Sequence, residues 1–214
     1  MDKVRVIEIK QSVFKNNDEQ AEKLRGELKS KGVFLLNLMS SPGSGKTTTL
    51  KATINALKDK LKIDVDAIKI AETGVKSIQL HTGGMCHLDA AMTKQGVEAL
   101  GTDGVELAIL ENVGNLVCPA EFDTGAVKNV MILSVPEGDD KPLKYPLMFK
   151  VSDVVLINKI DVLPYFDFDV EKCKEYIKHR NPNAKIFLIC AKTGEGIEEW
   201  ATWLNDEVRE WIDK

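Results

Sequence analysis

The segment Met39–Thr49 reads MSSPGSGKTTT and contains the residue types that bind phosphate. Gly43 and Gly45 let the backbone approach an anion closely, so that successive N–H groups point at its oxygens. Lys46 and Thr47 follow at the spacing of a phosphate-binding loop. There the lysine reaches the β- and γ-phosphates, and the hydroxyl is a ligand of Mg²⁺. The segment therefore predicts a nucleoside triphosphate site.

The surroundings of this loop support the same interpretation, although Ser40 stands where the strict pattern has glycine. An apolar run at residues 33–38 precedes the loop and helical spacing at residues 50–57 follows it, which is the strand–loop–helix context that the site requires. An ordinary turn before a helix is the weaker alternative. The loop residues that we expect at the nucleotide are Gly43, Ser44, Gly45, Lys46, Thr47 and Thr48.

A second motif, Asn-Lys-Ile-Asp at residues 158–161, follows a buried apolar strand, where open α/β sheets bind ligands. Asp161 can accept hydrogen bonds from the N1–H and 2-amino groups of guanine, which adenine lacks. We expect Lys159 to lie along the base and Asn158 to tie this loop to the phosphate loop. Ala191 and Lys192, after the last strand, complete the base site. A chance polar turn is the alternative for the motif alone, but its order after the phosphate loop predicts GTP.

Glu111 ends an intervening strand, and Gly114 follows three residues later. In GTPases an acidic residue at this place holds Mg²⁺, and the glycine frees a loop that senses the γ-phosphate. A surface ion pair at the end of a strand is the alternative for Glu111. The predicted catalytic residues are thus Lys46, Thr47 and Glu111, with Thr47 and Glu111 as the residues that hold Mg²⁺.

Cys86, His87 and Cys118 form a third candidate group, because two thiolates and an imidazole suit Ni²⁺ or Zn²⁺. From spacing alone, three such residues are more often unrelated. Their place in the chain favours a metal site: Cys118 lies seven residues after Glu111, and Cys86 and His87 follow a neighbouring strand, so both parts are expected at the same end of the sheet. The remaining two cysteines, Cys173 and Cys190, are interpreted as structural.

These groups require an α/β fold that brings strand ends together. Strands alternate with helices along the chain, which predicts a P-loop NTPase-type three-layer αβα fold with a mostly parallel sheet. We expect residues 1–31 to form an edge strand and a helix packed on the core, and residues 32–214 to form the GTPase domain. The expected strands are 3–10, 33–38, 61–63, 75–81, 106–110, 129–135, 153–157 and 185–189, and the expected helices are 13–31, 50–57, 67–73, 85–100, 142–151, 170–179 and 197–212. The strand from residue 61 is expected to break off at Asp64.

Composition limits the class of protein further. The chain has 214 residues, of which 43% are hydrophobic, enough for one α/β domain with a full core. A net charge of −4 without a basic run disfavours nucleic acid as a partner. No apolar stretch approaches the roughly 20 residues of a membrane span and no signal peptide is evident. Four scattered cysteines fit reduced thiols. We therefore expect a cytoplasmic protein without a membrane partner.

From Lys3 onward the chain resembles the hydrogenase nickel-incorporation GTPases, the HypB family. The resemblance is carried by SSPGSGKTT (40–48), HTGGMCHLDA (81–90), ENVGNLVCPAEFD (111–123), EGDDKPLKYP (137–146) and NKID (158–161). It implies that Cys86, His87 and Cys118 form a metal site at a homodimer interface. It also implies nickel delivery to the large subunit of [NiFe]-hydrogenase, together with a HypA-like partner metallochaperone.

Several features depart from the family pattern. Residues 1–11 contain no cysteine and the chain has three histidines, so we expect neither of the nickel-rich segments that some members carry. The family's Gly-Asp loop is missing where Ile63 meets Asp64, and its Mg²⁺-binding aspartate is therefore not assigned. No arginine finger is evident, and the resemblance points to Lys141 or Lys144 as a lysine acting across the dimer.

Two alternative functions stay open. One is the urease-type nickel GTPase, which is expected to carry Cys-Pro-His, whereas Ala120 follows Cys118 and Pro119 here. The other is a nickel carrier whose GTP pocket is largely structural, an interpretation that the missing loop after Ile63 keeps open.

Overall fold

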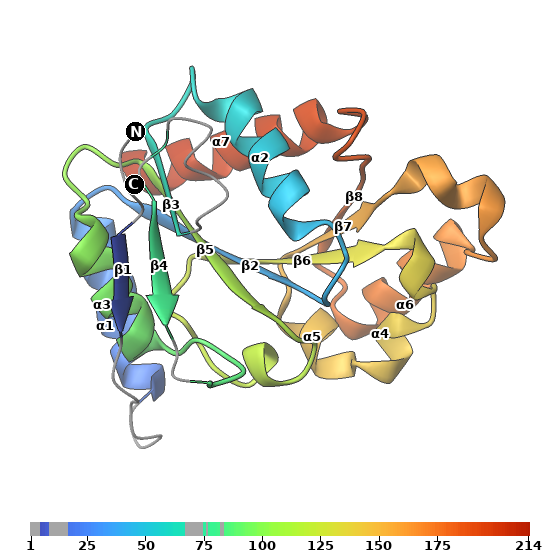
Figure 1. Ribbon diagram of the computed structural model, residues 1–214, viewed down its shortest axis with the longest axis horizontal. Coiled ribbons are helices and arrows are strands. Elements are labelled where there is room, and N and C mark those ends of the chain that lie inside the picture. Colours follow the sequence, from blue (N-terminus) through green and yellow to red (C-terminus); the bar gives the residue numbers. More distant parts are fainter. Residues whose placement is uncertain (1–4, 9–16, 67–74, 76, 82–83) are drawn as a thin grey trace.

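A six-stranded, all-parallel sheet forms the centre of the fold in the computed structural model, which describes residues 5–8, 17–66, 75, 77–81 and 84–214 (Figure 1). The strand order is β3-β5-β2-β6-β7-β8, which confirms the predicted α/β class. The strands are β2 Phe34–Ser40, β3 Ile63–Asp66, β5 Leu107–Gly114, β6 Lys128–Ser134, β7 Val154–Asn158 and β8 Lys185–Leu188. All six carboxyl ends lie at one edge, because parallel strands share a direction.

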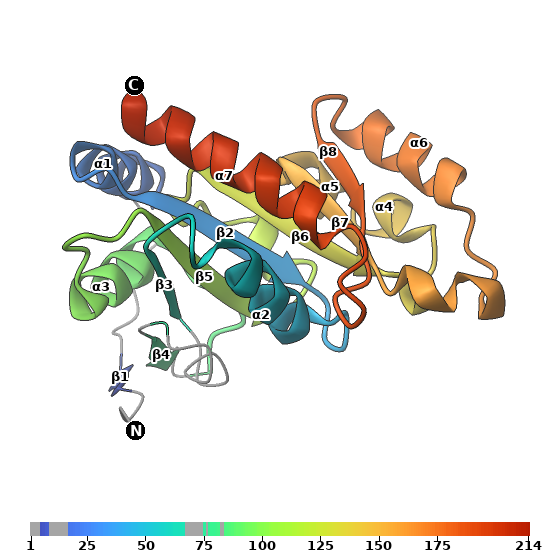
Figure 2. The same ribbon diagram turned by 90° about the horizontal axis from the view of Figure 1, so that it is seen from above.

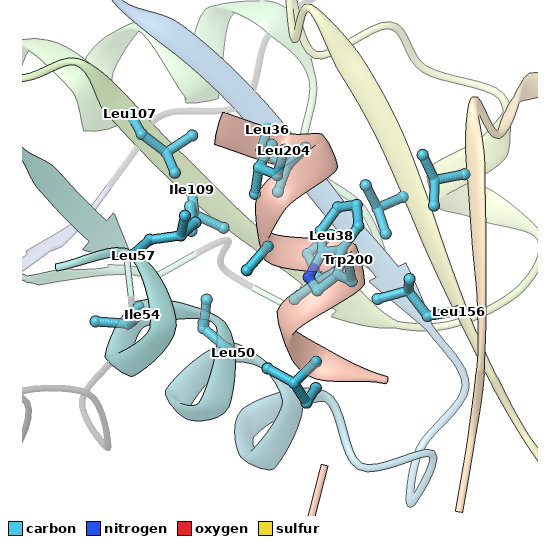
Figure 3. Close-up of a cluster of buried hydrophobic side chains, with 14 of the residues drawn as sticks. Leu36, Leu38, Leu50, Ile54, Leu57, Leu107, Ile109, Leu156, Trp200 and Leu204 are labelled. Carbon is cyan, nitrogen blue, oxygen red and sulfur yellow. The ribbon is translucent and has the colours of Figure 1, made fainter. Parts of the chain in front are cut away.

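Two helices, α2 (Lys46–Leu57) and α7 (Ile197–Asp213), cover one face of this sheet (Figures 1 and 2). Alternate residues of the central strands point at them and form an apolar cluster around Trp200 (Figure 3). Its indole N–H donates to Oγ1 of Thr53 at 3.0 Å, so burial of the ring leaves no polar atom unpaired. This packing fixes α2, and with it the phosphate loop, against the sheet.

The opposite face is covered by α1 (Asn17–Ser30), α3 (Ala90–Leu100), α5 (Pro146–Val151) and α6 (Val170–Arg180). The predicted helix 142–151 is wrong as one element: α4 (Lys141–Lys144) and α5 are separate. Tyr145 between them has φ −125° and ψ 59°, because the residue before a proline avoids helical geometry. Between β7 and α6 a 3₁₀ helix, Ile160–Tyr165, was not predicted.

The strand predicted at 61–63 is longer than expected and does not break at Asp64. It runs to Asp66 as β3 and pairs residue by residue with β5, from Ile63 opposite Leu107 onward. The ladder satisfies the backbone groups of β3 that face β5, and β3 is an edge strand, where charged residues are tolerated. The helix predicted at 67–73 lies outside the described residues.

The strand predicted at 75–81 is present as β4 (Ile78–His81), but it is not part of the large sheet. It pairs in parallel with β1 (Arg5–Glu8), which confirms the described part of the predicted edge strand 3–10 (Figure 1). The other residues of that prediction lie outside the described residues. A strand's own residue pattern does not specify its partner, because pairing depends on side-chain packing across strands. No helix among the described residues has the length and apolar character needed to cross a membrane.

Candidate nucleotide and metal sites

The phosphate loop leads from β2 into the N-terminus of α2, as the sequence predicts. Gly43 and Gly45 have φ values of +77° and +97°, which favour glycine. A Cβ atom on Gly45 would stand 2.5 Å from Nδ2 of Asn158. The absence of a side chain at residue 45 therefore also allows the loop at residues 158–161, here called the base loop, to approach. Ser44 Oγ is buried and has no hydrogen-bond partner among the described residues. This hydroxyl therefore has an unused donor, and the first N–H groups of a helix have no partner within it, which is the chemistry that a phosphate group requires.

Lys46 is held inside the loop by the residue that departs from the usual pattern. Its Nζ atom donates to Oγ of Ser40 at 3.1 Å, and Ser40 is fully buried at the end of β2. Burial lowers the pKa of Lys46, while the nearby carboxylate of Glu111 opposes this change. A serine in place of glycine thus anchors the lysine before any nucleotide binds.

Thr47 and Glu111 come from different elements and meet at the start of α2. Oγ1 of Thr47 lies 3.4 Å from Oε1 of Glu111, which stands opposite Leu38 in the β2–β5 ladder. Hydroxyl and carboxylate oxygens are the ligands that Mg²⁺ prefers. The predicted pair is therefore adjacent and chemically suited to this ion.

Gly114 brings the end of β5 against the phosphate loop. A Cβ atom placed on it would lie 3.4 Å from the backbone N of Pro42 and 3.5 Å from Nζ of Lys46. The backbone of residue 114 is therefore next to the lysine expected to contact the terminal phosphate. This is the position that a γ-phosphate sensor needs.

The base loop is joined to the phosphate loop through the side chain of Asn158, which is 2% exposed. Its Nδ2 group donates to the carbonyl of Ser44 at 2.9 Å, and its Oδ1 atom accepts from the N–H of Ala191 at 3.1 Å. Lys159 has φ +63° and donates through Nζ to the carbonyl of Gly43 at 2.7 Å. One asparagine thus connects the three segments predicted to surround the nucleotide.

The carboxylate of Asp161 is exposed, as is the side chain of Lys192, so both are accessible to a base. Asp161 lies in the 3₁₀ helix that begins at Ile160.

The two candidate metal thiols, Cys86 and Cys118, are close enough to interact although 32 positions separate them. Their interaction, more than burial, raises the pKa of the exposed Cys86 thiol. Asn115 donates through Nδ2 to Sγ of Cys118 at 3.5 Å, so a residue next to Gly114 holds this thiol. The sequence predicted that the two cysteines follow neighbouring strands of one sheet. This is partly wrong, because β4, which precedes Cys86, does not neighbour β5 in the large sheet.

His87 is adjacent in sequence but oriented by a different contact. Its ring stacks on Phe122 with centroids 3.6 Å apart and planes inclined by 5°. Burial lowers the pKa of His87, against the raising effects of Asp89 and Glu121. Nδ1 lies 3.9 Å from Sγ of Cys86. Asp89 caps α3, so Cys86 and His87 precede this helix and do not open it as predicted.

Among the residues that the structure describes, no three His, Cys, Asp or Glu side chains form a group that could hold a metal ion by themselves. The single chain therefore brings together two thiols with an imidazole beside one of them, which is part of a coordination shell. A complete shell needs further ligands or a rearrangement of these three side chains.

Sequence reasoning missed one residue that shapes the phosphate loop, Glu137. Its Oε2 atom accepts hydrogen bonds from the N–H and Oγ of Ser134 at 2.8 and 2.7 Å, and its Oε1 atom accepts from Oγ of Ser41. The spacing Ser134-x-x-Glu137 is that of a capping box, a signal that could have placed this carboxylate. Its bond to Ser41 is long-range and has no such signal.

A parallel sheet between helices, a strand–loop–helix phosphate site and an Asn-Lys-x-Asp loop define the class of P-loop GTPases. The family model for the CobW/HypB/UreG nucleotide-binding domain matches residues 34–188. The chain belongs to this family and, within it, to the HypB hydrogenase maturation factors.

The relatives that establish this membership span most of the chain. It is 47% identical over 210 residues to hydrogenase maturation factor HypB of Azotobacter chroococcum, covering 94% of this chain and 68% of the relative. The corresponding protein of Escherichia coli K12 is 44% identical over 216 residues, with 97% and 74% covered. The crystal structure of Helicobacter pylori HypB in complex with nickel superposes with a TM-score of 0.84 at 39% identity, covering 91% of this chain and 95% of that one.

Proposed function

We propose that this protein binds and hydrolyses Mg²⁺·GTP and uses the nucleotide state to control a nickel site, in support of [NiFe]-hydrogenase maturation. One observation carries the proposal. Gly114 lies beside Lys46. Four residues later, Cys118 accepts a hydrogen bond from Asn115 and interacts with Cys86. A movement of this loop toward the terminal phosphate would therefore displace a metal-binding thiol.

On the nucleotide side, Asp161 recognises guanine, and Asn158, Lys159, Ala191 and Lys192 shape the base pocket. The geometry that supports these roles is the network by which Asn158 joins the three loops. The rejection of adenine follows from the unpaired lone pairs that it would leave on the carboxylate.

At the phosphates, the loop N–H groups and Lys46 neutralise charge, and Thr47 and Glu111 hold Mg²⁺. When bound, Mg²⁺ supplies further neutralisation of charge on the phosphoryl oxygens. Gly43, Ser44, Gly45 and Thr48 contribute through the backbone and hydroxyls of the loop. Positioning and electrostatic stabilisation provide most of the catalysis, because phosphoryl transfer needs little covalent chemistry from the protein.

On the metal side, Cys86, His87 and Cys118 bind nickel as cargo, and Zn²⁺ suits the same donors. The H. pylori relative is described as a nickel complex, which supports this choice. A GTP-dependent homodimer would bring a second set of the same residues close and complete the shell that one chain leaves partial. Lys141 or Lys144 is then the candidate lysine for the opposite nucleotide site.

The remaining roles follow from the family. We propose a HypA-like metallochaperone and the hydrogenase large subunit as partners, the cytoplasm as the location, and a division into residues 1–31 and a GTPase domain at 32–214. Burial of Leu24 and Leu28 of α1 against the sheet supports packing of the first part on the second.

Two alternatives are tested together with the main proposal. A nickel carrier with a structural GTP pocket would bind both ligands and not turn over GTP. A urease-type function is disfavoured by Ala120, which lies where the third residue of Cys-Pro-His is expected.

Single-turnover hydrolysis of GTP, with and without Mg²⁺, separates a GTPase from a carrier. We expect Mg²⁺-dependent release of phosphate. Stoichiometric GTP binding without phosphate release would favour the carrier.

Nickel titration monitored by thiolate-to-metal absorption then tests the coupling. We expect nickel or zinc affinities to differ by about 5- to 150-fold between the GTP-analogue and GDP states, the usual range of allosteric coupling. Cys86→Ala and Cys118→Ala should remove stoichiometric nickel binding, with Cys190→Ala as the matched control. Equal affinities in both states, with a dimer present in the analogue state, would contradict the coupling.

A further inference from the structure

The carboxyl end of β5 contains one more residue than the strand beside it. Leu38 of β2 pairs with Glu111, but Ser40, two residues later, pairs with Gly114, three residues later. The extra residue is a β-bulge, which bends a strand and leaves one of its backbone groups without a ladder partner. The bulge lies between the residue expected to hold Mg²⁺ and the residue expected to sense the γ-phosphate.

The side chain of Asn112 satisfies the backbone of this bulge. Its Oδ1 atom accepts a hydrogen bond from the N–H of Val113 at 2.8 Å, and its Nδ2 group donates to Oδ1 of Asn37 at 3.1 Å. Asn112 is 2% exposed and Asn37 is 1% exposed, so water does not compete for these bonds.

The chain of amides continues across the sheet. Nδ2 of Asn37 donates to Oδ1 of Asn129 at 2.9 Å, and these two residues are direct partners in the β2–β6 ladder. The backbone of Asn129 exchanges hydrogen bonds with Asp153, whose Oδ2 atom accepts from its N–H at 2.8 Å. We call Asn112, Asn37 and Asn129 the amide ladder. It connects β5, β2 and β6 with side-chain bonds in addition to those of the backbone.

One backbone group fixes the orientation of all three amides. The N–H of Val113 can only donate, so Asn112 must turn its oxygen toward it and its NH₂ group toward Asn37. Asn37 must then present oxygen to Asn112 and NH₂ to Asn129. The hydrogen bonds therefore run in one direction from the bulge to β6, and chains of this kind polarise one another.

The surroundings of the amide ladder are apolar. Met39 and Met131 belong to the core cluster on one side, and Leu35 and Leu110 belong to the cluster on the other. Burial of unpaired amides there would be costly, and leucine would pack in their place without that cost. Polar residues at these positions are therefore better explained by the geometry that they impose than by stability.

We propose that Asn112 and Asn37 are positioning residues that set the β5 bulge and thereby place Glu111 beside Thr47 and Gly114 beside Lys46. Neither asparagine is among the residues expected at the nucleotide. Both act through the two residues of β5 that the proposed function assigns to Mg²⁺ and the γ-phosphate, so the inference rests on that function. The hydrogen bonds by which Asn158 joins Ser44 and Ala191 involve no residue of the ladder.

Asn112→Leu and Asn37→Leu test this assignment, with the same substitution at the exposed loop residue Asn183 as the control. We expect GDP affinity, measured with a fluorescent analogue, to stay within about twofold. The kcat for GTP and the preference for a non-hydrolysable GTP analogue over GDP should each fall by ~10- to 100-fold, because displacement of catalytic groups by about 1 Å has effects of that size. The KM for GTP should rise with the lost affinity for the triphosphate.

The outcomes separate this inference from the proposed function. A wild-type protein that hydrolyses no GTP would contradict the proposed function, while the analogue-to-GDP preference still tests the ladder. Leucine variants that unfold more easily but keep kcat and this preference would show a structural role alone and overturn the inference. If the leucine variants do not fold, hydrogen exchange in the wild type decides. Slow exchange of the Val113 amide is expected, and rapid exchange would overturn the assignment.

Discussion

Oγ1 of Thr47 lies 3.4 Å from Oε1 of Glu111, although 64 residues separate them in the chain. Thr47 is in the first turn of α2, and Glu111 is on β5, the strand that pairs with the edge strand β3. The contact exists because the β2–β5 ladder sets Glu111 opposite Leu38, just before the phosphate loop. A hydroxyl and a carboxylate oxygen at this separation can bind the same cation.

Glu111→Gln should lower Mg²⁺ affinity and kcat for GTP by at least tenfold, because it removes a charged ligand and keeps the length of the side chain. GDP binding without Mg²⁺ should change little. Phosphate release measured against Mg²⁺ concentration checks this prediction. Glu171→Gln, at an exposed position of α6, is the control. Unchanged Mg²⁺ dependence in Glu111→Gln would assign the ion to other residues.

Asp161→Asn should weaken GTP binding by a few kcal/mol, on the order of 2–3, and improve binding of xanthosine triphosphate, whose 2-position is an acceptor. Competition between the two nucleotides on the same protein measures the change. Asp167→Asn alters a nearby exposed carboxylate and should leave the preference for GTP intact. If GTP affinity is the same in both variants, the base is recognised elsewhere.

Gly114→Ala should separate triphosphate from diphosphate binding. The added methyl would lie 3.5 Å from Nζ of Lys46, an ordinary contact that the empty loop tolerates but that occupies space beside the lysine where a terminal phosphate must approach. We expect GDP affinity to stay close to wild type, while GTP-analogue affinity falls ~10-fold or more, as expected for a displaced contact to a charged group. Equal losses for both nucleotides would argue against a sensing role for residue 114.

Thiol reactivity should divide the four cysteines into two pairs. Burial raises the pKa of Cys173 to about 12, and both Cys173 and Cys190 are buried, so neither side chain is accessible to a reagent in the folded protein. Cys86 is exposed and Cys118 half-buried. Mass spectrometry after alkylation should therefore find Cys86 and Cys118 modified first, with Cys173 and Cys190 modified only in denaturant. Nickel should slow modification of the first pair, and an absence of protection would count against the metal site.

Glu106 should make the stability of the fold depend on pH at the amino end of β5. Burial raises its pKa, but hydrogen bonds from the N–H of Lys62 and the guanidinium of Arg209 outweigh this effect, and the folded pKa is lowered. A lowered folded pKa means that the stabilisation is present above the unfolded pKa of about 4.3 and is lost as pH falls through the folded value.

Glu106→Gln should therefore reduce the free energy of unfolding at pH 7 by on the order of 0.5–1 kcal/mol, a small value because solvent screens this partly exposed group. The difference from wild type should shrink below about pH 4. Urea denaturation at pH 7 and pH 3.5 measures both values. A difference that is the same at the two pH values would exclude the ion pair as its cause.

The sequence by itself determined the local features of this protein. Gly43, Gly45 and Lys46 specify a phosphate loop because backbone conformation and side-chain chemistry are set within a few residues. The alternation of apolar strands with amphipathic helices predicted the parallel sheet, since burial on both faces leaves a readable pattern. Asn158 was predicted to tie two loops, and the structure gives it that contact with Ser44.

Tertiary structure decided which distant elements meet. β4 pairs with β1 and not with the large sheet. The thiols of Cys86 and Cys118 are nevertheless close enough to interact, which the order of strands in the sequence does not explain. The amide ladder through Asn37 and the bond from Ser41 to Glu137 join residues far apart in the chain. Such contacts depend on register and packing across elements, which no residue encodes in its immediate neighbours.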